Sequence, residues 1–325
     1  MKSILVVGGA GYIGSHVVLA FLNAGYRVTV LDNMSTGQQT NLIKEAEFIL
    51  GDILDRELLK DLFTTKFDGV IHLAALKAAG ESMIYPEKYT YQNINGTMNL
   101  LEAVSLSGTR TVIFSSTAAV YGVPEYLPLD ENHPINPINY YGFTKHEIER
   151  FLEWYHRLKN IQTASLRYFN AAGYDPDGRI LGLEKGPENL IPKVMETLVG
   201  LQDLFEVYGD DYSTPDGTCI RDYIHVSDLA NAHLKAFEYL TREENSIALN
   251  FGTGRGYSVM DVINMTESVS GRKLNYKIGS RRLGDPAELY ADASQAKELL
   301  GWVPQLSDLE SIIQTTWAVY QDLVL

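Results

Sequence analysis

The stretch Gly8-Gly9-Ala10-Gly11-Tyr12-Ile13-Gly14 follows the apolar run Ser3–Val7 and leads into the amphipathic segment Ile13–Ala24. We therefore predict a strand, a glycine-rich turn and a helix. The three evenly spaced glycines permit a tight turn, let the backbone approach a diphosphate and let helix and strand pack closely. The helix N-terminus adds unpaired N–H groups and a partial positive charge under the phosphates. The alternative is a glycine-rich turn that binds no ligand.

Asp32 ends the next predicted strand, 18 residues after Gly14. An acid at this place accepts hydrogen bonds from the ribose hydroxyls of an adenine dinucleotide and repels a 2′-phosphate. Because no arginine adjoins Asp32, the sequence favours NAD over NADP. The alternative is that Asp32 is only a turn or cap residue before Asn33. Asp52, after the third predicted strand, either meets the adenine or caps a helix.

Short apolar runs alternate with longer amphipathic segments over the first two-thirds of the chain. Several runs lack polar alternation, which is typical of strands buried on both faces of a parallel sheet. The series predicts an α/β fold with a doubly wound parallel sheet of the Rossmann type. The predicted strands are Ser3–Val7, Arg27–Leu31, Glu47–Leu50, Val70–Leu73, Thr111–Ser115 and Thr163–Tyr168. The predicted helices are Ile13–Ala24, Arg56–Thr64, Glu87–Leu106 and Tyr140–Leu158.

Loop-forming residues become more frequent after about residue 172, which indicates a second domain. We expect an NAD-binding domain over residues 1–172 and a smaller α/β substrate domain over residues 173–325, with interleaved chain segments. Residues 221–245 are expected to return to the first domain. Within them, Val226–Leu240 is predicted to form a helix capped by Ser227 or Asp228.

The balance of 27 Lys and Arg against 41 Asp and Glu gives a net charge of −14. This charge disfavours binding to nucleic acid or to an anionic membrane, since both need a basic face. The single cysteine, Cys219, excludes an internal disulfide, and no apolar run reaches the roughly 20 residues of a membrane span. We expect a cytoplasmic protein. His16, His72 and His225 lack the spacing of metal ligands, so no metal is expected.

Tyr141 and Lys145 lie four residues apart near the start of a predicted helix, so they share one face. Thr117 follows a predicted strand at the sheet edge where ligands bind. A tyrosine needs roughly 4 kcal/mol of help to act as a base at pH 7, and an ammonium about 4 Å away supplies most of it. The three residues predict oxidation of an alcohol by NAD, with Thr117 holding the hydroxyl. A chance Tyr-x-x-x-Lys pair is the alternative.

Longer motifs extend over nearly the whole chain. They are residues 8–16 (GGAGYIGSH), 31–33 (LDN), 76–82 (LKAAGES), 120–122 (VYG), 166–170 (LRYFN), 221–226 (RDYIHV) and 281–285 (RRLGD). In these motifs the chain resembles the extended short-chain dehydrogenase/reductase family, and within it the UDP-glucose 4-epimerases. The resemblance implies an isomerase that interconverts UDP-galactose and UDP-glucose through a transient 4-keto sugar with tightly bound NAD. Tyr141 would take the proton from the carbon-4 hydroxyl.

The resemblance also implies the binding residues and the assembly. The cofactor would contact Gly8, Gly11, Tyr12, Ile13, Gly14, Asp32, Asn33, Asp52, Ile53, Lys77, Asn93, Tyr141, Lys145 and Tyr168. The UDP-sugar would contact Lys77, Thr117, Tyr141, Asn170, Asn189, Arg221, Arg282, Asp285 and Leu289. The guanidinium groups of Arg221 and Arg282 suit diphosphate oxygens, and ordinary surface salt bridges are the alternative for both. For Asn170, Asn189 and Asp285 the alternative is a role as a turn or cap residue. Helices Glu87–Leu106 and Tyr140–Leu158 would pair across a two-fold axis in a homodimer.

Two residues depart from the family pattern. Thr117 replaces the usual serine, and Leu289 occupies the position that gates the pocket for carbon 2 of the sugar. Leucine there predicts partial acceptance of UDP-N-acetylglucosamine and UDP-N-acetylgalactosamine. Ala118-Ala119 disfavours 4,6-dehydratases and decarboxylases, which need acids at this place. An epimerase of UDP-glucuronate or a UDP-pentose, or a non-catalytic NAD-binding protein, remains an alternative.

Overall fold

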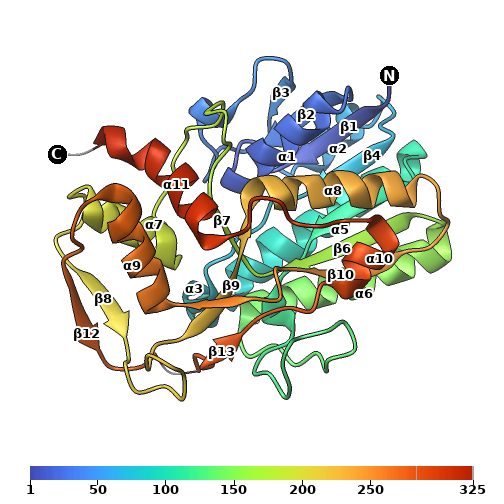
Figure 1. The fold of residues 1–325 in the computed structure, drawn as a ribbon. Helices are drawn as coiled ribbons and strands as arrows, with labels where there is room; N and C mark the ends of the chain where they lie inside the picture. Colours follow the sequence, from blue (N-terminus) through green and yellow to red (C-terminus); the bar gives the residue numbers. More distant parts are fainter. Residues whose placement is uncertain (283, 324–325) are drawn as a thin grey trace.

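The computed structural model describes residues 1–282 and 284–323, so Leu283 of the motif at 281–285 lies outside the described residues. Its largest element is a seven-stranded sheet whose paired strands run parallel (Figure 1). Across the sheet the order is β10 (Ile247–Phe251), β6 (Gln162–Tyr168), β5 (Thr111–Ser115), β4 (Gly69–His72), β1 (Ser3–Val7), β2 (Arg27–Asp32) and β3 (Glu47–Leu50). This arrangement confirms the predicted doubly wound sheet. β10, which the sequence analysis did not identify, is the seventh strand.

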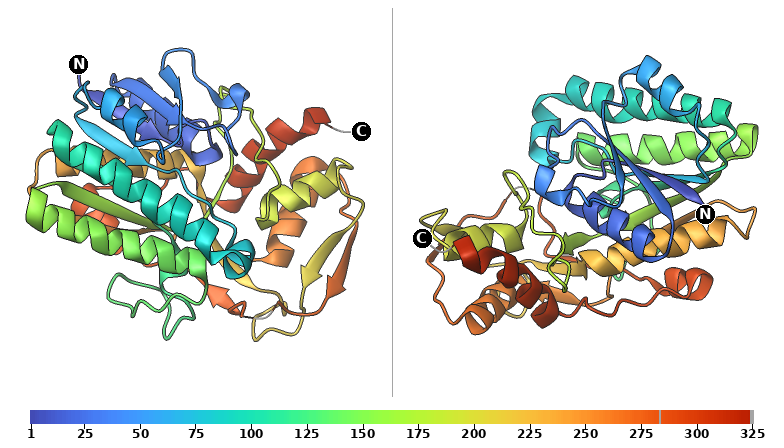
Figure 2. Two further views of the ribbon diagram at one scale, coloured as in Figure 1. Left: turned by 180° about the vertical axis from the view of Figure 1, so that it is seen from behind. Right: turned by 90° about the horizontal axis from the view of Figure 1, so that it is seen from above.

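Helices cover both faces of this sheet (Figure 2). One face carries α1 (Tyr12–Asn23) and α8 (Val226–Leu240), and the other carries α2 (Arg56–Leu62), α5 (Gly96–Ser107) and α6 (Tyr140–Lys159). Phe21 of α1 and Phe237 of α8 pack edge to face at 5.8 Å on the first side. Leu59, Leu101 and Ile148 belong to the buried cluster on the second side. The two apolar layers explain why the central strands show no polar alternation.

Two helix predictions need correction. The predicted helix Glu87–Leu106 consists of α4 (Pro86–Tyr89), the π-helical segment η2 (Thr90–Asn95) and α5 in direct succession. The cap of α8 is neither Ser227 nor Asp228 but His225, whose side chain accepts the N–H of Ser227 at 3.1 Å. The Asp228 carboxylate points elsewhere, because it accepts hydrogen bonds from residues 305–307.

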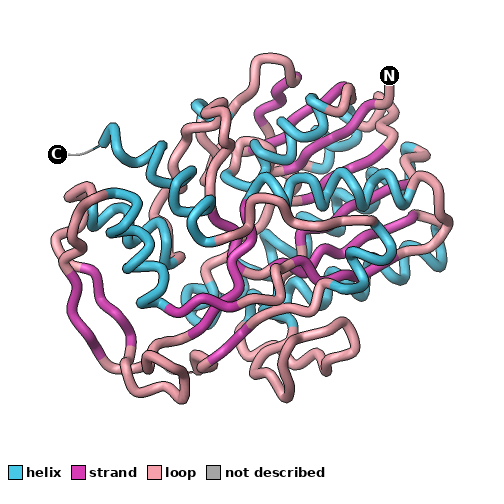
Figure 3. Tube along the Cα trace, in the orientation of Figure 1, coloured by secondary structure: helices cyan, strands magenta, loops and turns pink. Residues whose placement is uncertain are grey.

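The smaller part of the molecule is built around short strands (Figure 3). A four-stranded sheet contains β7 (Asn170–Ala172), β9 (Ile220–His225), β11 (Gly256–Ser258) and β13 (Glu288–Leu289), and a parallel ladder pairs β8 (Phe205–Tyr208) with β12 (Tyr276–Gly279). The helices are α7 (Leu190–Leu198), α9 (Val259–Ser270) and α11 (Leu309–Tyr320). Shorter elements are η1 (Gln39–Asn41), α3 (Ala79–Ile84), η3 (Ala118–Val120), α10 (Ser294–Leu300) and η4 (Gln321–Leu323).

The chain passes back and forth between the two parts. β9 pairs with β7 in the smaller sheet, and the chain then continues as α8 and β10 of the larger one. Within the segment 221–245, residues 221–225 thus belong to the smaller sheet, and α8 packs against the larger one. The boundary between domains at residues 172 and 173 stays a prediction. Over residues 1–282 and 284–323, no helix has the length and apolar character that a bilayer crossing requires.

Candidate active site

A cavity of about 450 Å³ opens at the carboxyl ends of β1, β2 and β4. Gly8, Gly11 and Gly14 line it where β1 turns into α1. Gly8 has a φ of +85°, which side chains rarely tolerate, and a Cβ atom on Gly14 would lie 2.0 Å from the Gly8 carbonyl oxygen. The turn therefore places backbone without side chains, and the first N–H groups of α1, at the cavity wall. Such N–H groups can donate hydrogen bonds to a diphosphate.

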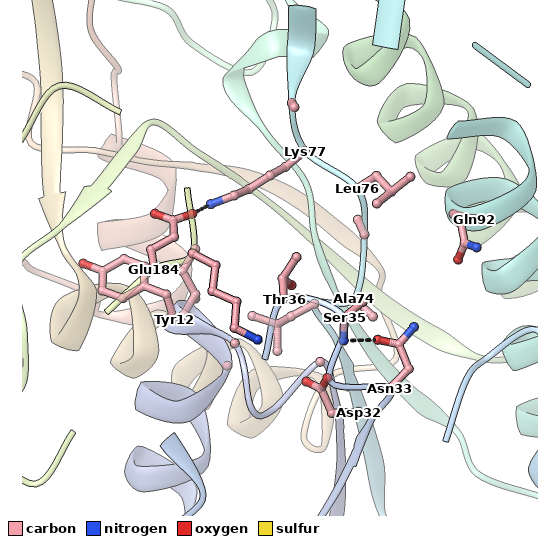
Figure 4. Close-up of a pocket in the computed structure, with 18 of the residues that line it drawn as sticks. Tyr12, Asp32, Asn33, Ser35, Thr36, Ala74, Leu76, Lys77, Gln92 and Glu184 are labelled. Atoms are coloured by element: carbon pink, nitrogen blue, oxygen red, sulfur yellow. Dashed lines mark hydrogen bonds and ion pairs between the residues drawn. The ribbon is translucent and has the colours of Figure 1, made fainter. Parts of the chain in front are cut away.

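Asp32 lies at the end of β2 and is only 8% exposed. Its carboxylate accepts the N–H groups of Ala10 and Met34, each at 2.9 Å, so it is fixed in place at the cavity wall. Figure 4 shows Asp32 beside Asn33, which donates to the Asp52 carboxylate at 2.8 Å. Asp52 does not cap α2, because the cap is Asp55. Asp32, Asn33, Asp52 and Ile53 all line the cavity.

Lys77 lines the same cavity and forms an ion pair with Glu184 (Figure 4). Glu184 and Lys185 precede α7, and the Lys185 ammonium donates to the Gly37 carbonyl oxygen at 3.0 Å. No sequence motif marks either residue. The segment that carries them joins the smaller part of the molecule to the cofactor side of the larger one, so both parts contribute to the cavity wall.

Asn93 differs from the other predicted cofactor residues, because it does not line this cavity. It is buried in η2, where its side chain accepts the N–H of Leu76 at 2.8 Å and donates to the Leu76 carbonyl oxygen at 3.0 Å. These two hydrogen bonds fix the backbone next to Lys77. In this structure Asn93 therefore acts on the cavity through the segment that carries Lys77.

Tyr141 lies in the first turn of α6 and lines the cavity. The helix is capped by Asn139, whose side chain accepts the N–H of Gly142 at 2.8 Å. The N–H of Tyr141 donates to the hydroxyl of Ser82 in α3 at 3.0 Å. Ser82 is completely buried, and the sequence analysis quoted it in a motif without giving it a function. Ser82 holds the turn of helix that carries Tyr141.

Lys145 lies one turn after Tyr141 and also lines the cavity. Its ammonium donates to the Ser115 carbonyl oxygen at 2.7 Å and lies 4.6 Å from the centre of the Phe114 ring. Burial lowers the pKa of Lys145 to about 7, and the nearby Glu149 carboxylate opposes this effect. The lysine therefore changes charge near neutral pH.

Tyr141 differs from the electrostatic expectation of the sequence analysis. Burial raises the pKa of its phenol well above 10, the neighbouring Tyr168 raises it further, and a hydrogen bond with Thr117 acts in the opposite direction. Lys145 does not lower it as expected, because the lysine ammonium lies 5.9 Å from the centre of the Tyr141 ring and binds Ser115 instead. The hydrogen bond with Tyr141 does place the Thr117 hydroxyl beside the phenol. Tyr168 lines the cavity too.

A second cavity of about 340 Å³ adjoins the first, since Glu188 and Asn189 line both. Its other lining residues include four more of the predicted substrate ligands, Asn170, Arg221, Arg282 and Asp285. The Arg221 guanidinium donates to Asp285 at 2.7 Å. The Arg282 guanidinium lies 3.8 Å from the centre of the Tyr208 ring. Two cations thus face this acidic protein's second cavity.

Three further predicted residues occupy defined places around this cavity. The Asn170 side chain donates to the Asp222 carbonyl oxygen at 2.9 Å, and Asn189 precedes α7 without a side-chain cap bond. Leu289 lies in β13 opposite Arg221 of β9. Leu289 is half-buried against the apolar cluster that contains Tyr121, and it does not line the second cavity. Cys219 is buried with a free thiol.

His16, His72 and His225 are buried residues with structural roles. Burial lowers the pKa values of His16 and His225 to about 4 and that of His72 to about 3, so all three are neutral at pH 7. His16 accepts the N–H of Asp175 at 3.1 Å, and His72 contacts the Thr97 hydroxyl at 2.8 Å. Within the described part of the chain, no three His, Cys, Asp or Glu residues are placed to hold a metal ion.

Comparison with known proteins decides the family. The profile of the NAD dependent epimerase/dehydratase family matches residues 4–252. The chain belongs to this family. A UDP-glucose 4-epimerase from Halalkalibacterium halodurans is 45% identical over 317 residues, which are 97% of this chain and 94% of that protein.

Solved structures of other family members are closely similar. The UDP-glucose 4-epimerase of Brucella ovis, in complex with NAD, matches with a TM-score of 0.94 and 45% identity over 97% of both chains. The enzyme from Bifidobacterium longum, in complex with NAD⁺ and UDP, matches with a TM-score of 0.93 and 38% identity over 99% of this chain and 98% of that chain.

NAD is therefore the cofactor of this family member, and the first cavity fits it. The tight glycine turn at the start of α1 admits a diphosphate, and a buried carboxylate at the end of β2 suits the ribose hydroxyls. The prediction of NAD as the cofactor is confirmed. Tyr141 and Lys145 lie in the wall of the same cavity.

Proposed function

We propose that the protein is a UDP-glucose 4-epimerase that interconverts UDP-galactose and UDP-glucose. The observation that supports this most directly is that Tyr141 and Lys145 line the wall of a dinucleotide cavity, which continues into a second cavity containing two arginines. One cavity suits the cofactor and the other suits an anionic nucleotide-sugar. The sugar would then lie where the two cavities meet, close to the phenol of Tyr141.

The chain's own residues provide the acid–base chemistry. The Tyr141 side chain accepts the proton of the carbon-4 hydroxyl in its phenolate form, and Thr117, already hydrogen-bonded to that side chain, orients the sugar oxygen. For that phenolate to be stabilised, the Lys145 ammonium must turn toward it from the Ser115 carbonyl oxygen that it binds in this structure. When bound, NAD supplies a hydride acceptor that takes hydrogen from carbon 4 and later returns it to the opposite face. Burial of both side chains keeps water away from the ketone that exists between the two transfers.

The second cavity supports the assignment of a nucleoside diphosphate. Arg221 and Arg282 would each form hydrogen bonds with the phosphate oxygens, because the guanidinium fork matches their geometry. In the structure Arg221 pairs with Asp285, which we assign to the ribose of the substrate. Asn170 and Asn189 complete the polar wall toward the sugar and the uracil.

Proton NMR of the sugar anomeric signals tests the proposal. The purified protein is incubated with UDP-galactose and no added NAD. Formation of UDP-glucose would demonstrate 4-epimerisation and a retained cofactor together. Unchanged UDP-galactose, even with NAD added, would contradict the assignment. UDP-glucuronate and a UDP-pentose, tested in the same assay, would then identify another epimerase, and a protein that changes none of these sugars would be a non-catalytic NAD-binding protein.

We infer that Leu289 permits some turnover of the N-acetylated UDP-sugars. Leu289 pairs in β13 with Arg221 of β9, which lines the second cavity, and its own side chain packs against the apolar cluster that contains Tyr121. A leucine occupies less space than a tyrosine, and a tyrosine would narrow the room next to carbon 2. Leu289→Tyr should lower the ratio of UDP-N-acetylglucosamine to UDP-glucose turnover, measured with both sugars. An unchanged ratio would refute the inference.

We also propose a cytoplasmic homodimer formed through α5 and α6. These helices lie side by side on one outer face (Figure 2, left), and Leu106, Trp154 and Leu158 are 81%, 54% and 70% exposed. Large apolar side chains gathered on one face indicate an interface. Trp154→Glu should shift the sedimentation coefficient from dimer to monomer, and Tyr126→Glu on a distant exposed loop should not. A wild-type protein that sediments as a monomer would refute the proposal.

A further inference from the structure

A buried ion pair lies directly behind the catalytic side chains. Arg167 of β6 donates to Glu149 of α6 through two nitrogen atoms, at 2.7 Å from Nη2 to Oε2 and 3.0 Å from Nε to Oε1. Both side chains are only 7% exposed. A buried ion pair need not add to the free energy of unfolding, because removing two charges from water costs energy. In some proteins such pairs instead fix one arrangement of the side chains around them.

The pair reaches the active site through Ser116. The Ser116 hydroxyl donates to the Glu149 carboxylate, and the Ser116 N–H donates to the Leu166 carbonyl oxygen at 2.9 Å. Ser116 lies between Ser115 and Thr117 in the chain, and both of these residues contact side chains of the active site. Ser115 binds the Lys145 ammonium through its carbonyl oxygen and the Tyr168 phenol through its hydroxyl at 2.6 Å.

On the other side of Ser116 is Thr117, which is hydrogen-bonded to the phenol of Tyr141. Glu149 is therefore one residue away from the contacts that hold Lys145, Tyr168 and Tyr141. A shift of Ser116 would move all of these contacts at once. Reaction rates depend steeply on such placement, since misplacing a reacting group by about 1 Å can cost a factor of about 100.

Arg167 extends the network in a second direction. Its Nη1 donates to the Tyr121 hydroxyl at 3.1 Å, and that hydroxyl donates to the Asn250 side chain at 2.7 Å. The Asn250 side chain in turn donates to the Leu129 carbonyl oxygen at 3.0 Å. Tyr121 is the C-cap and Thr117 the N-cap of the short helix η3. The network thus supports the segment after β5 at both ends.

The charge of Glu149 acts on Lys145, which precedes it by one turn of α6. The groups around Lys145 come from several elements: Tyr141 on the same helix, Tyr168 on β6, the Phe114 ring on β5 and His72 on β4. His72 is neutral at pH 7, as are the two phenols. The Glu149 carboxylate also pairs with Arg167, and His146 Nδ1 lies 3.9 Å from it. Its negative charge favours the protonated lysine.

We propose that Glu149 and Arg167 are positioning residues: together they fix the end of β5 that carries Ser115 and Thr117, and through Ser115 they fix the place of the Lys145 ammonium. Neither side chain lines the cavities, so neither touches cofactor or sugar. The inference rests on the proposed function for its rate measurements. Its second measurement, the titration of Lys145, requires no sugar.

The test uses Glu149→Gln in the protein with its retained cofactor. The amide preserves the shape and an acceptor for Ser116 but removes the charge. We expect kcat with UDP-galactose to fall at least about tenfold, with KM and bound NAD within twofold of wild type. NMR titration of labelled lysine, assigned with Lys145→Met, should show a lower midpoint for Lys145. Glu153→Gln is the matched control, since Glu153 pairs with Arg157 on the exposed side of the same helix.

Glu149→Asp retains the charge and should keep the lysine midpoint close to that of wild type. If Glu149→Gln does not fold, the double variant Glu149→Leu/Arg167→Met replaces both charges with apolar side chains and should fold with the same loss of kcat. A folded Glu149→Gln or double variant with wild-type kcat would overturn the proposal, as would an unmoved Lys145 midpoint. Failure of the wild type to epimerise UDP-galactose would instead overturn the proposed function, and the lysine titration would still decide the role of Glu149.

Discussion

Gly14→Ala gives the sharpest prediction about cofactor retention. A Cβ atom at this position would lie 2.0 Å from the Gly8 carbonyl oxygen and 2.8 Å from the Gly9 Cα atom. Ordinary contacts begin near 3.4 Å, so the start of α1 must move by more than 1 Å from the turn. Both obstacles are backbone atoms, which cannot rotate away. The helix end that should face the diphosphate would therefore lose its position.

The expected magnitude follows from this displacement. Overpacking of this kind costs about 1–3 kcal/mol, which corresponds to a fall in melting temperature of roughly 2–10 °C for a domain of this size. The displaced N–H groups would also bind the cofactor weakly. We expect purified Gly14→Ala to contain less NAD than wild type, because each loss of about 1.4 kcal/mol weakens binding tenfold.

Two other glycines supply a graded comparison. A Cβ atom on Gly11 would approach the Gly8 carbonyl oxygen only to 3.3 Å, and one on Gly80 in α3 would have no neighbour within 4 Å. Two quantities are measured: the NAD released by acid and the melting temperature by calorimetry. Both should be near the wild-type value in Gly80→Ala, intermediate in Gly11→Ala and lowest in Gly14→Ala. Full NAD occupancy and an unchanged melting temperature in Gly14→Ala would refute the reasoning.

Three further predictions concern other parts of the molecule. Ser82→Ala leaves the buried N–H of Tyr141 without its acceptor, a loss of about 1–3 kcal/mol, and should lower kcat more than it raises KM in steady-state assays; equal changes in both would contradict this role. Arg221→Met should raise KM for UDP-galactose at least about tenfold while kcat falls less, and an unchanged KM would remove Arg221 from the phosphate site. Burial holds the pKa values of His16 and His233 at about 4, so the unfolded chain takes up protons first as pH falls below 6.5. Urea unfolding should then show stability falling between pH 6.5 and 4 by up to about 1.4 kcal/mol per unit for each histidine, and a flat profile would contradict it.

The first half of the larger sheet could be predicted from the sequence because its signals are local. The strand, glycine turn and helix over residues 3–24 are contiguous, and their pattern depends on near neighbours alone. The same is true of the start of α6, where Asn139 marks the cap. β10 was missed because it joins the sheet beside β6, about 80 residues earlier in the chain, and no local pattern reports that pairing.

The sequence predicted which residues form the site better than it predicted the contacts between them. Tyr141 and Lys145 were found from their spacing, but the direction of the Lys145 ammonium depends on the Ser115 carbonyl oxygen, a backbone atom that no motif marks. Burial of both side chains, which sets their pKa values, depends on elements from the whole domain. The pairs Ser82–Tyr141 and Glu149–Arg167 join residues 59 and 18 positions apart, and only the folded chain brings them together.

The return of the chain to the larger sheet has a consequence for synthesis on the ribosome. α1 and α8 pack against each other on one face, yet about 200 residues separate the end of one from the start of the other. At about 5–20 residues per second, α1 emerges roughly 10–40 s before its partner is made. During that interval Phe21 and its apolar neighbours have no cover from Phe237. The nascent chain therefore exposes this apolar surface until α8 leaves the exit tunnel.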